Sequence, residues 1–277
     1  MIRQYRIGCA VRSDDEDTFC ALDGLHADGR IDHVQVQIIP EPEPVFQRRL
    51  DSLAAAAAPI VIHAPHHAHG VNPCAPALCD GFAPEEIASH VEQAMHQTTE
   101  AADTLDSAII VLHAGRFTDE EERQDAAEAF AGFLDRYHDP RLTLENLPAV
   151  HAGYPFLGST ADELAALGDG RIGGYCLDFA HLYCTVNYRH LTYTDELRRF
   201  EDLNVRHQHI SNSIRGSVTD QHLELDHPEG GLDFAAVFGR IAAHPSVETT
   251  LEYKRDSYGI YPRQLAVFDG LYRRYGK

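Results

Sequence analysis

The sequence has very few lysines. Only Lys254 and Lys277 occur among 23 basic residues, which stand against 43 acidic ones and leave a formal net charge of −20. This charge repels nucleic acid at long range, so a nucleic-acid substrate would need a locally positive site, which bound divalent cations would partly supply. An acidic surface poor in lysine suits a salty cytoplasm, and a biased genome composition would produce the same deficit.

Long apolar runs are also missing. No stretch of about 18 uncharged apolar residues occurs, so the sequence predicts no membrane span. The first residues, MIRQYRIGCAVRSDDED, lack the apolar segment of a secretory signal, and we expect a cytoplasmic protein. Hydrophobic residues nevertheless make up 44% of the chain, which is enough for a full core.

Cysteines are few and scattered. The six thiols do not form the pattern of a small disulfide-bonded domain, and we expect them to be reduced. Cys74 and Cys79 fall in one expected loop. Their spacing fits no standard zinc motif, so ordinary loop cysteines are the favoured interpretation and metal ligation is the alternative.

Short β-type runs alternate with helical segments along the whole chain, with no break in composition. This alternation predicts one domain over residues 1–277, a closed (β/α)8 TIM barrel, with an open doubly wound sheet as the alternative. No GxGxxG or phosphate-binding loop follows any strand, which weakens the nucleotide-binding form of that alternative. The expected strands are 6–11, 33–39, 59–63, 107–113, 141–145, 173–178, 205–209 and 247–252.

Several helix starts are visible between these strands. Pro84 is expected to begin one helix and Pro262 the last one. Capping boxes are predicted at 118–121 and 160–163, and apolar residues at helical spacing predict a helix over 234–241. Two long connections, 64–83 and 211–231, follow the third and seventh strands, at the barrel end where such enzymes place their sites.

Ionisable and imidazole side chains collect at the strand ends. The residues at or just after the ends of six consecutive strands and in the last long loop are His63, His113, Glu145, Asp178, His181, His209, Asp220, His222 and Glu252. Taken singly, a strand-end histidine is more often a hydrogen-bonded core residue, and Asp178 could be only a helix N-cap. Taken together, they would be costly without cations, because desolvation and like charges both penalise them.

These residues predict a cluster of two or three divalent metal ions. The mixed nitrogen and oxygen donors indicate zinc, with manganese or iron as alternatives, rather than magnesium or calcium. The set is too large for one ion, and Glu145, in the middle of the series, is the natural bridging carboxylate. Glu145 and Glu252 are also the candidate catalytic carboxylates.

The motifs HAPHH, VLHAG, LENLP, CLDFAH, HISN, DQH and TLEY follow one another in this order. In these motifs the chain resembles the endonuclease IV family (AP endonuclease family 2) of the xylose isomerase-like barrels. The resemblance implies three ligand groups: His63, His113 and Glu145; Glu145, Asp178, His209 and Glu252; His181, Asp220 and His222. It also implies a metal-activated water that attacks a phosphodiester beside an abasic site in DNA.

The substrate-binding features depart from that family. The loop after the second strand, PEPEP at 40–44, is acidic and stiff, and no basic stripe runs along the sequence. His66, Arg116 and Arg215 are the candidate substrate contacts, together with Arg206, although a solvated structural role is the alternative for each arginine. The expected substrate is therefore a phosphodiester or a sugar, with DNA doubtful because of the acidic surface.

Two other functions remain open. A sugar isomerase or epimerase of the same superfamily would need only Glu145, Asp178, His209 and Glu252, with the two glutamates moving protons. That function leaves four of the candidate ligands unexplained, namely His63, His113, Asp220 and His222. A barrel that only binds a ligand is disfavoured, because no ligand position is missing. The sequence gives no indication of oligomeric state.

Overall fold

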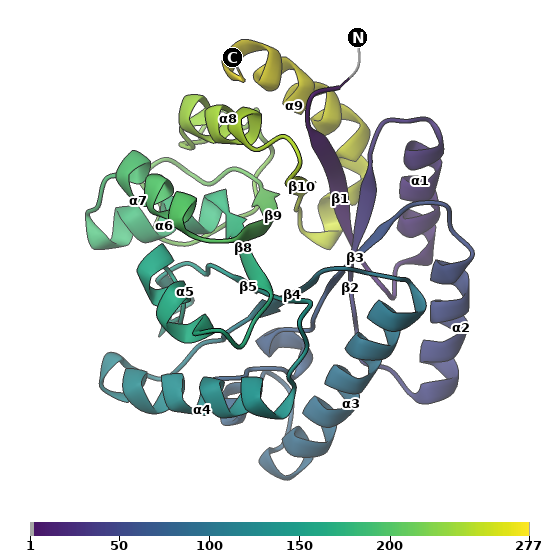
Figure 1. Cartoon of the computed structure of the whole chain (residues 1–277), viewed down its shortest axis with the longest axis vertical. Helices are drawn as coiled ribbons and strands as arrows, with labels where there is room; N and C mark the ends of the chain where they lie inside the picture. The colour runs from purple at the N-terminus through teal and green to yellow at the C-terminus, as the bar shows by residue number, and fades with distance from the viewer. Residues whose placement is uncertain (1–2, 277) are drawn as a thin grey trace.

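Parallel strands close into a barrel in the computed structural model, which describes residues 3–276 (Figure 1). The order around the barrel is β1-β10-β9-β8-β5-β4-β3-β2, so the first strand joins the last. The predicted TIM barrel is confirmed. The strands are β1 (Arg6–Arg12), β2 (His33–Gln37), β3 (Ile60–His63), β4 (Ile110–His113), β5 (Leu142–Glu145), β8 (Gly174–Asp178), β9 (Val205–Ile210) and β10 (Glu248–Leu251).

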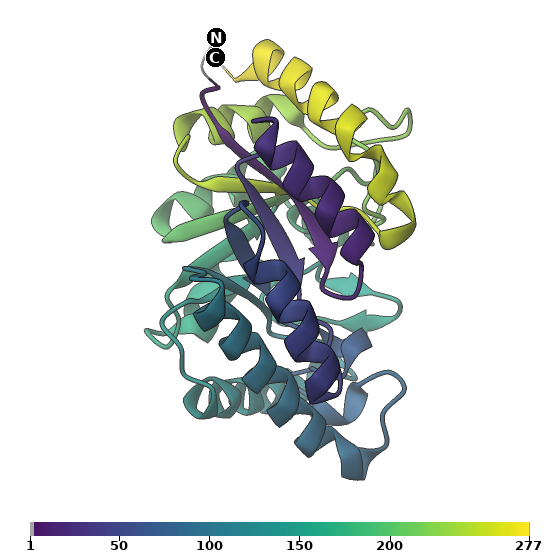
Figure 2. The same ribbon diagram turned by 90° about the vertical axis from the view of Figure 1, so that its right-hand side faces the viewer.

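Helices cover the outer side of the strands (Figures 1 and 2). They are α1 (Glu16–Ala27), α2 (Glu43–Ala54), α3 (Pro84–Thr104), α4 (Arg123–Arg136), α5 (Ala161–Gly168), α6 (Phe179–Arg189), α7 (Tyr193–Arg199), α8 (Phe234–Ala243) and α9 (Tyr261–Tyr275). Helices α3 and α8 lie where the sequence predicts them, and α9 begins one residue before Pro262. Within the described residues, no helix is both long and apolar enough to cross a bilayer.

The two predicted capping boxes have different outcomes. Thr160 caps α5, because its hydroxyl accepts the backbone N–H of Glu163 at 3.3 Å. The prediction at Thr118 is wrong, because Asp119 instead caps a short 3-10 turn and α4 begins only at Arg123. A carboxylate competes well with a hydroxyl for a free backbone N–H, which is the physical reason for the shift.

The long connections have structure of their own. The segment after β3 contains two 3-10 turns, η1 (His67–His69) and η2 (Pro76–Leu78). The connection after β5 carries a small antiparallel hairpin, β6 (Val150–His151) and β7 (Tyr154–Pro155), which the sequence did not indicate. A further 3-10 segment, η5 (Arg255–Ile260), follows β10. His67 of η1, His151 of the hairpin and Arg255 of η5 border the space at the carboxyl end of the barrel, together with the strand-end residues.

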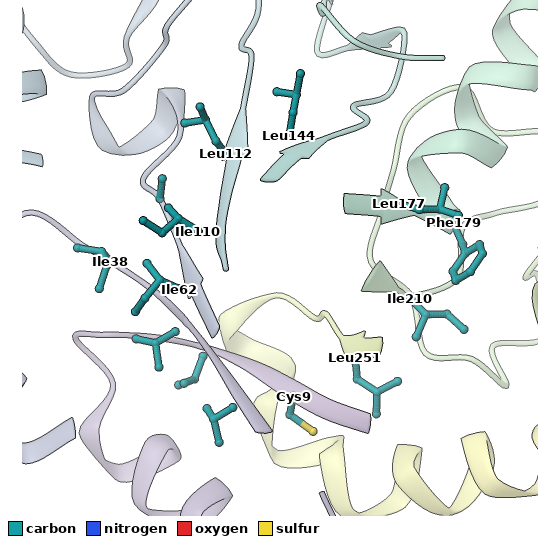
Figure 3. Close-up of a cluster of buried hydrophobic side chains, with 14 of the residues drawn as sticks. Cys9, Ile38, Ile62, Ile110, Leu112, Leu144, Leu177, Phe179, Ile210 and Leu251 are labelled. Atoms are coloured by element: carbon teal, nitrogen blue, oxygen red, sulfur yellow. The ribbon is translucent and has the colours of Figure 1, made fainter. Parts of the chain in front are cut away.

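Alternate residues of each strand belong to two different environments. Outward residues such as Ile62, Leu112 and Leu144 are buried in the main hydrophobic cluster, against the helices (Figure 3). Inward residues are mostly polar: the ring of His209 bonds Gln35 across the barrel interior, and the ring of His33 bonds Thr250 across β1. The hydrophobic core is therefore a layer between strands and helices, while the barrel interior is largely polar.

Candidate metal centre

Parallel strands bring the predicted ligands to one mouth of the barrel. Each strand end fixes one side chain, because the last inward position of a strand faces the opening. His63, His113, Glu145 and Asp178 are the last residues of β3, β4, β5 and β8, and His209 is the penultimate residue of β9. Glu252 follows β10, His181 lies in the first turn of α6, and Asp220 and His222 lie in the connection after β9.

The first group joins β3, β4 and β5. The Nε2 atoms of His63 and His113 lie 3.4 Å and 3.1 Å from the same carboxylate oxygen, Oε2, of Glu145. The Nδ1–H of His63 donates to the carbonyl of Ala64 at 2.6 Å, which leaves Nε2 with its lone pair. Metal-binding histidines are usually held by a hydrogen bond of this kind on the other ring nitrogen.

The second group joins β5, β8, β9 and β10. The Nδ1 of His209 lies 3.3 Å from Oε1 of Glu145, 3.2 Å from Glu252 and 4.0 Å from Asp178. Its Nε2–H donates to the side-chain oxygen of Gln35 at 2.7 Å, so Nδ1 is the free donor atom. One atom from each of the four residues lies within 4.8 Å of all the others.

The third group lies at the edge of the mouth. The Nε2 atoms of His181 and His222 lie 3.9 Å and 2.9 Å from Oδ2 of Asp220. The Nδ1–H of His181 donates to the carbonyl of Asn146 at 2.9 Å, and the second oxygen of Asp220 accepts the hydroxyl of Ser213. His222 has a φ of 51°, a left-handed conformation that costs energy in a non-glycine residue and places its ring toward Asp220.

Glu145 connects these groups. Its Oε2 faces His63 and His113, while its Oε1 faces His209 and also lies 3.2 Å from His181. The side chain is completely buried. A buried carboxylate whose two oxygens serve different sets of imidazoles has the geometry of a bridging ligand.

Asp178 has two roles in this geometry. Its Oδ1 accepts the backbone N–H of His181 at 2.6 Å, so Asp178 is the N-cap of α6. Its Oδ2 is buried and faces His209 at 4.0 Å. The helix-cap interpretation and a ligand role are therefore compatible, because they use different oxygens.

The charges of the cluster are strongly coupled. Burial raises the pKa of Asp178 to about 6, with the neighbouring carboxylate of Glu145 adding to the effect. Burial opposes protonation of His181, but Asp178 and Glu145 outweigh it and raise the pKa of His181 to about 10. In the same way Asp220 outweighs burial and raises the pKa of His222 to about 9. In the metal-free cluster, the protons on these two imidazoles therefore offset carboxylate charge that a bound cation would also offset.

The donor atoms fit divalent cations. Among residues 3–276, several buried polar atoms of the cluster have no hydrogen-bond partner, namely Glu145 Oε1, Asp178 Oδ2, His209 Nδ1, Asp220 Oδ2 and His222 Nδ1. Unpaired buried polar atoms are costly, and metal coordination is one way in which proteins satisfy them. Mixed imidazole and carboxylate donors suit zinc, manganese or iron.

A cavity of about 360 Å³ opens above the cluster. Of the cluster residues, His63, His113, His181, Asp220, His222 and Glu252 line it. Sequence reasoning missed other lining residues, notably Arg12, His151, Lys254, Arg255 and Tyr258. Lys254, one of only two lysines, stands two residues after the predicted ligand Glu252, and this position in the sequence would have indicated that it lies near the mouth.

The predicted substrate contacts differ in their position relative to the cavity. His66 lines the cavity, and its ring stacks on His113 with the centroids 5.6 Å apart. Arg116 and Arg215 are not among the described residues that line it. Arg116 instead pairs with Asp80 at 2.5 Å, and the guanidinium of Arg215 donates to the carbonyl of Gly230. The long connection after β3 folds back onto Arg116 and neutralises it there.

Two remaining predictions concern other parts of the chain. Arg206 lies at the wrong end of the barrel for substrate, because it bonds the carbonyls of Ala108 and Pro140 at the amino ends of β4 and β5. Cys74 and Cys79 are buried free thiols, and the Cys74 thiol donates to the carbonyl of Arg116 at 3.2 Å. In the described part of the chain, neither cysteine belongs to a group with metal-binding geometry.

Similarity to known proteins agrees with this geometry. The family model of the xylose isomerase-like TIM barrel matches residues 30–271. The chain belongs to this family. A probable endonuclease 4 of Mycobacterium leprae (strain Br4923) is 24% identical over 219 residues, which are 77% of this chain and 81% of that protein.

Solved structures of the xylose isomerase-like fold include proteins with different names. Endonuclease IV from Thermus thermophilus superposes with a TM-score of 0.62 at 20% identity, over 98% of each chain. A D-tagatose 3-epimerase-like protein superposes with a TM-score of 0.66 at 17% identity, also over 98% of each chain. At these identities the likeness establishes the shared barrel alone, so the reaction has to be argued from the residues.

Proposed function

We propose that this chain is a metal-dependent phosphodiester hydrolase that holds two or three divalent ions, zinc being the expected one and manganese or iron the alternatives. The observation that carries this proposal is the position of Glu145 between two sets of imidazoles, with one oxygen toward each. When bound, such ions supply a hydroxide nucleophile at neutral pH and offset the charge on the phosphate and the leaving oxygen.

The protein groups around the cavity would bind and orient the substrate. Glu252 and Asp220 are the cluster carboxylates that line the cavity, and Glu252 is the more exposed of the two, at 19% against 3%, so it would orient an attacking water. Lys254, Arg12 and Arg255 line the same cavity and would attract the phosphate. His66 would donate or accept one hydrogen bond at the substrate.

The local positive groups make an anionic substrate compatible with an acidic protein. Arg12 and Arg255 both pair with Asp14, at 2.7 Å and 3.4 Å, so part of their charge is already offset. No ion pair is found for Lys254 with any described residue. An abasic site in DNA and a smaller phosphodiester are both compatible with this proposal, and the net charge favours the smaller substrate.

A sugar isomerase or epimerase is the second candidate. The four residues that it needs, Glu145, Asp178, His209 and Glu252, lie together within 4.8 Å. In that reaction both glutamates would exchange protons with the substrate and so would have to touch it. Glu145 is completely buried and is not among the described residues that line the cavity. This burial favours the role of shared metal ligand, and with it the hydrolase.

One set of assays separates the two functions. The protein, stripped and reloaded with zinc or manganese, is given bis(4-nitrophenyl) phosphate, a duplex with an abasic site over a salt range, and a ketohexose. His113→Asn removes a ligand that only the hydrolase needs, and His96→Asn on the exposed face of α3 is the matched control. We expect hydrolysis that falls by about a hundredfold in H113N and is kept in H96N. Sugar epimerisation that H113N leaves unchanged would establish the second candidate instead.

A further inference from the structure

A separate group of possible ligands lies at the opposite end of the barrel. His33 begins β2, Glu248 begins β10 and His207 lies early in β9, so all three are near the amino ends of their strands. One ring nitrogen of each histidine and one carboxylate oxygen of Glu248 lie within 4.8 Å of one another. None of the three belongs to the cluster at the mouth.

The two histidines are fully buried and only half satisfied. Their Nε2 atoms meet the hydroxyl of Thr250 at 2.8 Å and 2.9 Å. The Nδ1 atoms of both rings have no hydrogen-bond partner among residues 3–276. Each imidazole is thus fixed through one nitrogen and keeps the other uncommitted, as in the histidine ligands of metal sites.

A glycine makes this arrangement possible. Gly8 lies between His33 on β2 and Thr250 on β10 in the strand register. A Cβ at position 8 would lie 2.3 Å from Nε2 of His33, so any other residue would exclude the ring. The missing side chain therefore gives the His33 ring room to cross β1 and reach the side chains of β9 and β10.

Two members of the group, His33 and Glu248, line an open cavity. This cavity has a volume of about 280 Å³, and its other lining residues lie at the start of β3 or just before β3 and β4, Asp106 among them. The side chain of Glu248 is 15% exposed and pairs with Arg6 at 2.6 Å. Arg6 is itself 48% exposed, so a cation entering by this cavity could displace its guanidinium toward water.

We propose that His33, His207 and Glu248 form a divalent-cation site separate from the cluster at the mouth, for zinc or a metal of similar ligand preference. Two imidazoles and one carboxylate with an open position form an established zinc ligand set. Such an ion would tie β2 to β9 and β10 across β1. Because the amino end of these barrels usually serves stability, the site would reinforce barrel closure. This inference does not depend on the reaction at the mouth.

The test is a zinc titration of the metal-stripped full-length protein. Glu248→Gln is compared with Glu85→Gln, which removes a carboxylate on the exposed face of α3. Tightly bound zinc per chain is counted after gel filtration, and circular dichroism checks the fold. We expect E248Q to bind one ion fewer than the wild type, or to bind it at least about tenfold more weakly, and E85Q to match the wild type.

Arg6→Ala provides an independent test, because it should raise the zinc affinity that Glu248→Gln lowers. If the proposal holds, losing the competing guanidinium strengthens binding of that same ion. If Glu248 serves only as a partner for Arg6, R6A changes thermal stability alone. An equal zinc count and affinity in E248Q and the wild type overturns the site, and so does an R6A variant with unchanged zinc affinity. Anomalous scattering from a zinc-loaded crystal would locate the ion between His33 and His207.

Discussion

The Nε2 atom of His209 lies 2.7 Å from the side-chain oxygen of Gln35, on the far side of the ring from Glu145. Gln35 lies on β2 and His209 on β9, so the contact crosses the barrel interior. It fixes both the orientation and the tautomer of the imidazole and leaves Nδ1 as the donor atom.

Replacing Gln35 should therefore weaken metal binding although Gln35 is not itself a ligand. For Gln35→Ala we expect the zinc affinity of the four-residue group to fall by about ten- to a hundredfold, because the His209 ring loses its fixed orientation. A competing chromophoric chelator measures the affinity. Gln35→Glu, which keeps an acceptor, should recover most of the loss, and equal affinity in Q35A and wild type would contradict the positioning role.

Removal of ligands should change the number of bound ions unequally. Glu145→Ala affects two groups at once, whereas Asp220→Asn affects only the group with His181 and His222. We therefore expect E145A to lose more tightly bound zinc per chain than D220N. Elemental analysis of dialysed protein gives the count. If both variants lose the same amount, Glu145 does not bridge two groups.

Metal affinity should rise with pH. In the metal-free protein the pKa values of about 10 for His181 and about 9 for His222 mean that both rings carry a second proton, and so a positive charge, at neutral pH. That proton must leave before a ring nitrogen binds a cation, so the apparent affinity should increase by about tenfold per pH unit for each proton displaced, up to those pKa values. Calorimetry in buffers of different ionisation enthalpy counts the protons. An affinity independent of pH would show that neither ring is a ligand.

Two glycines offer a stability comparison. Gly8→Ala would place a Cβ 2.3 Å from the buried His33 ring, whereas a Cβ on Gly239 in α8 would meet nothing within 4 Å. Overpacking of this kind costs about 1–3 kcal/mol, so G8A should lower the free energy of unfolding by about that amount. Gly239→Ala should be neutral or slightly stabilising, by up to about 1 kcal/mol, because alanine favours a helix. Urea denaturation of both variants makes the measurement, and an unchanged G8A would refute the tight packing of His33.

Lys254 should contribute to substrate binding if the substrate is an anion. It lines the cavity, and Lys254→Gln should raise KM for a phosphodiester by roughly fivefold at low salt, in line with an exposed charge worth about 1 kcal/mol. Added salt should shrink the difference, because screening weakens the attraction in the wild type. Arg136→Gln, on the surface of α4, is the control. A KM that does not change in K254Q would assign Lys254 no part in binding.

Strand ends were predictable because parallel strands in a barrel all end at one face. Once the strand ending at His63 and the strand ending at Glu145 were identified, their meeting followed from topology alone. The three ligand groups came from a family resemblance, and the geometry brings each group together. That their members bind metal remains a prediction.

Other features depend on tertiary contacts that no local pattern encodes. Arg116 follows a strand-end motif and was expected at the substrate, but Asp80 from a distant turn pairs with it. The placement of Lys254 depends on the 3-10 segment that begins at Arg255. The sequence did not predict that His33 and His207 lie together, because their contact depends on the absence of a side chain at Gly8.

The division of each strand between an apolar outer side and a polar inner side makes this barrel a convenient scaffold for directed evolution. Leu112 and His113 are neighbours in sequence, yet one packs against helices and the other faces the mouth. A mutant library confined to inward positions would vary the chemistry of the mouth while leaving the helix-facing layer, which supplies most of the hydrophobic stabilisation, untouched. Variants with new activities could then be selected without many additional mutations that restore stability.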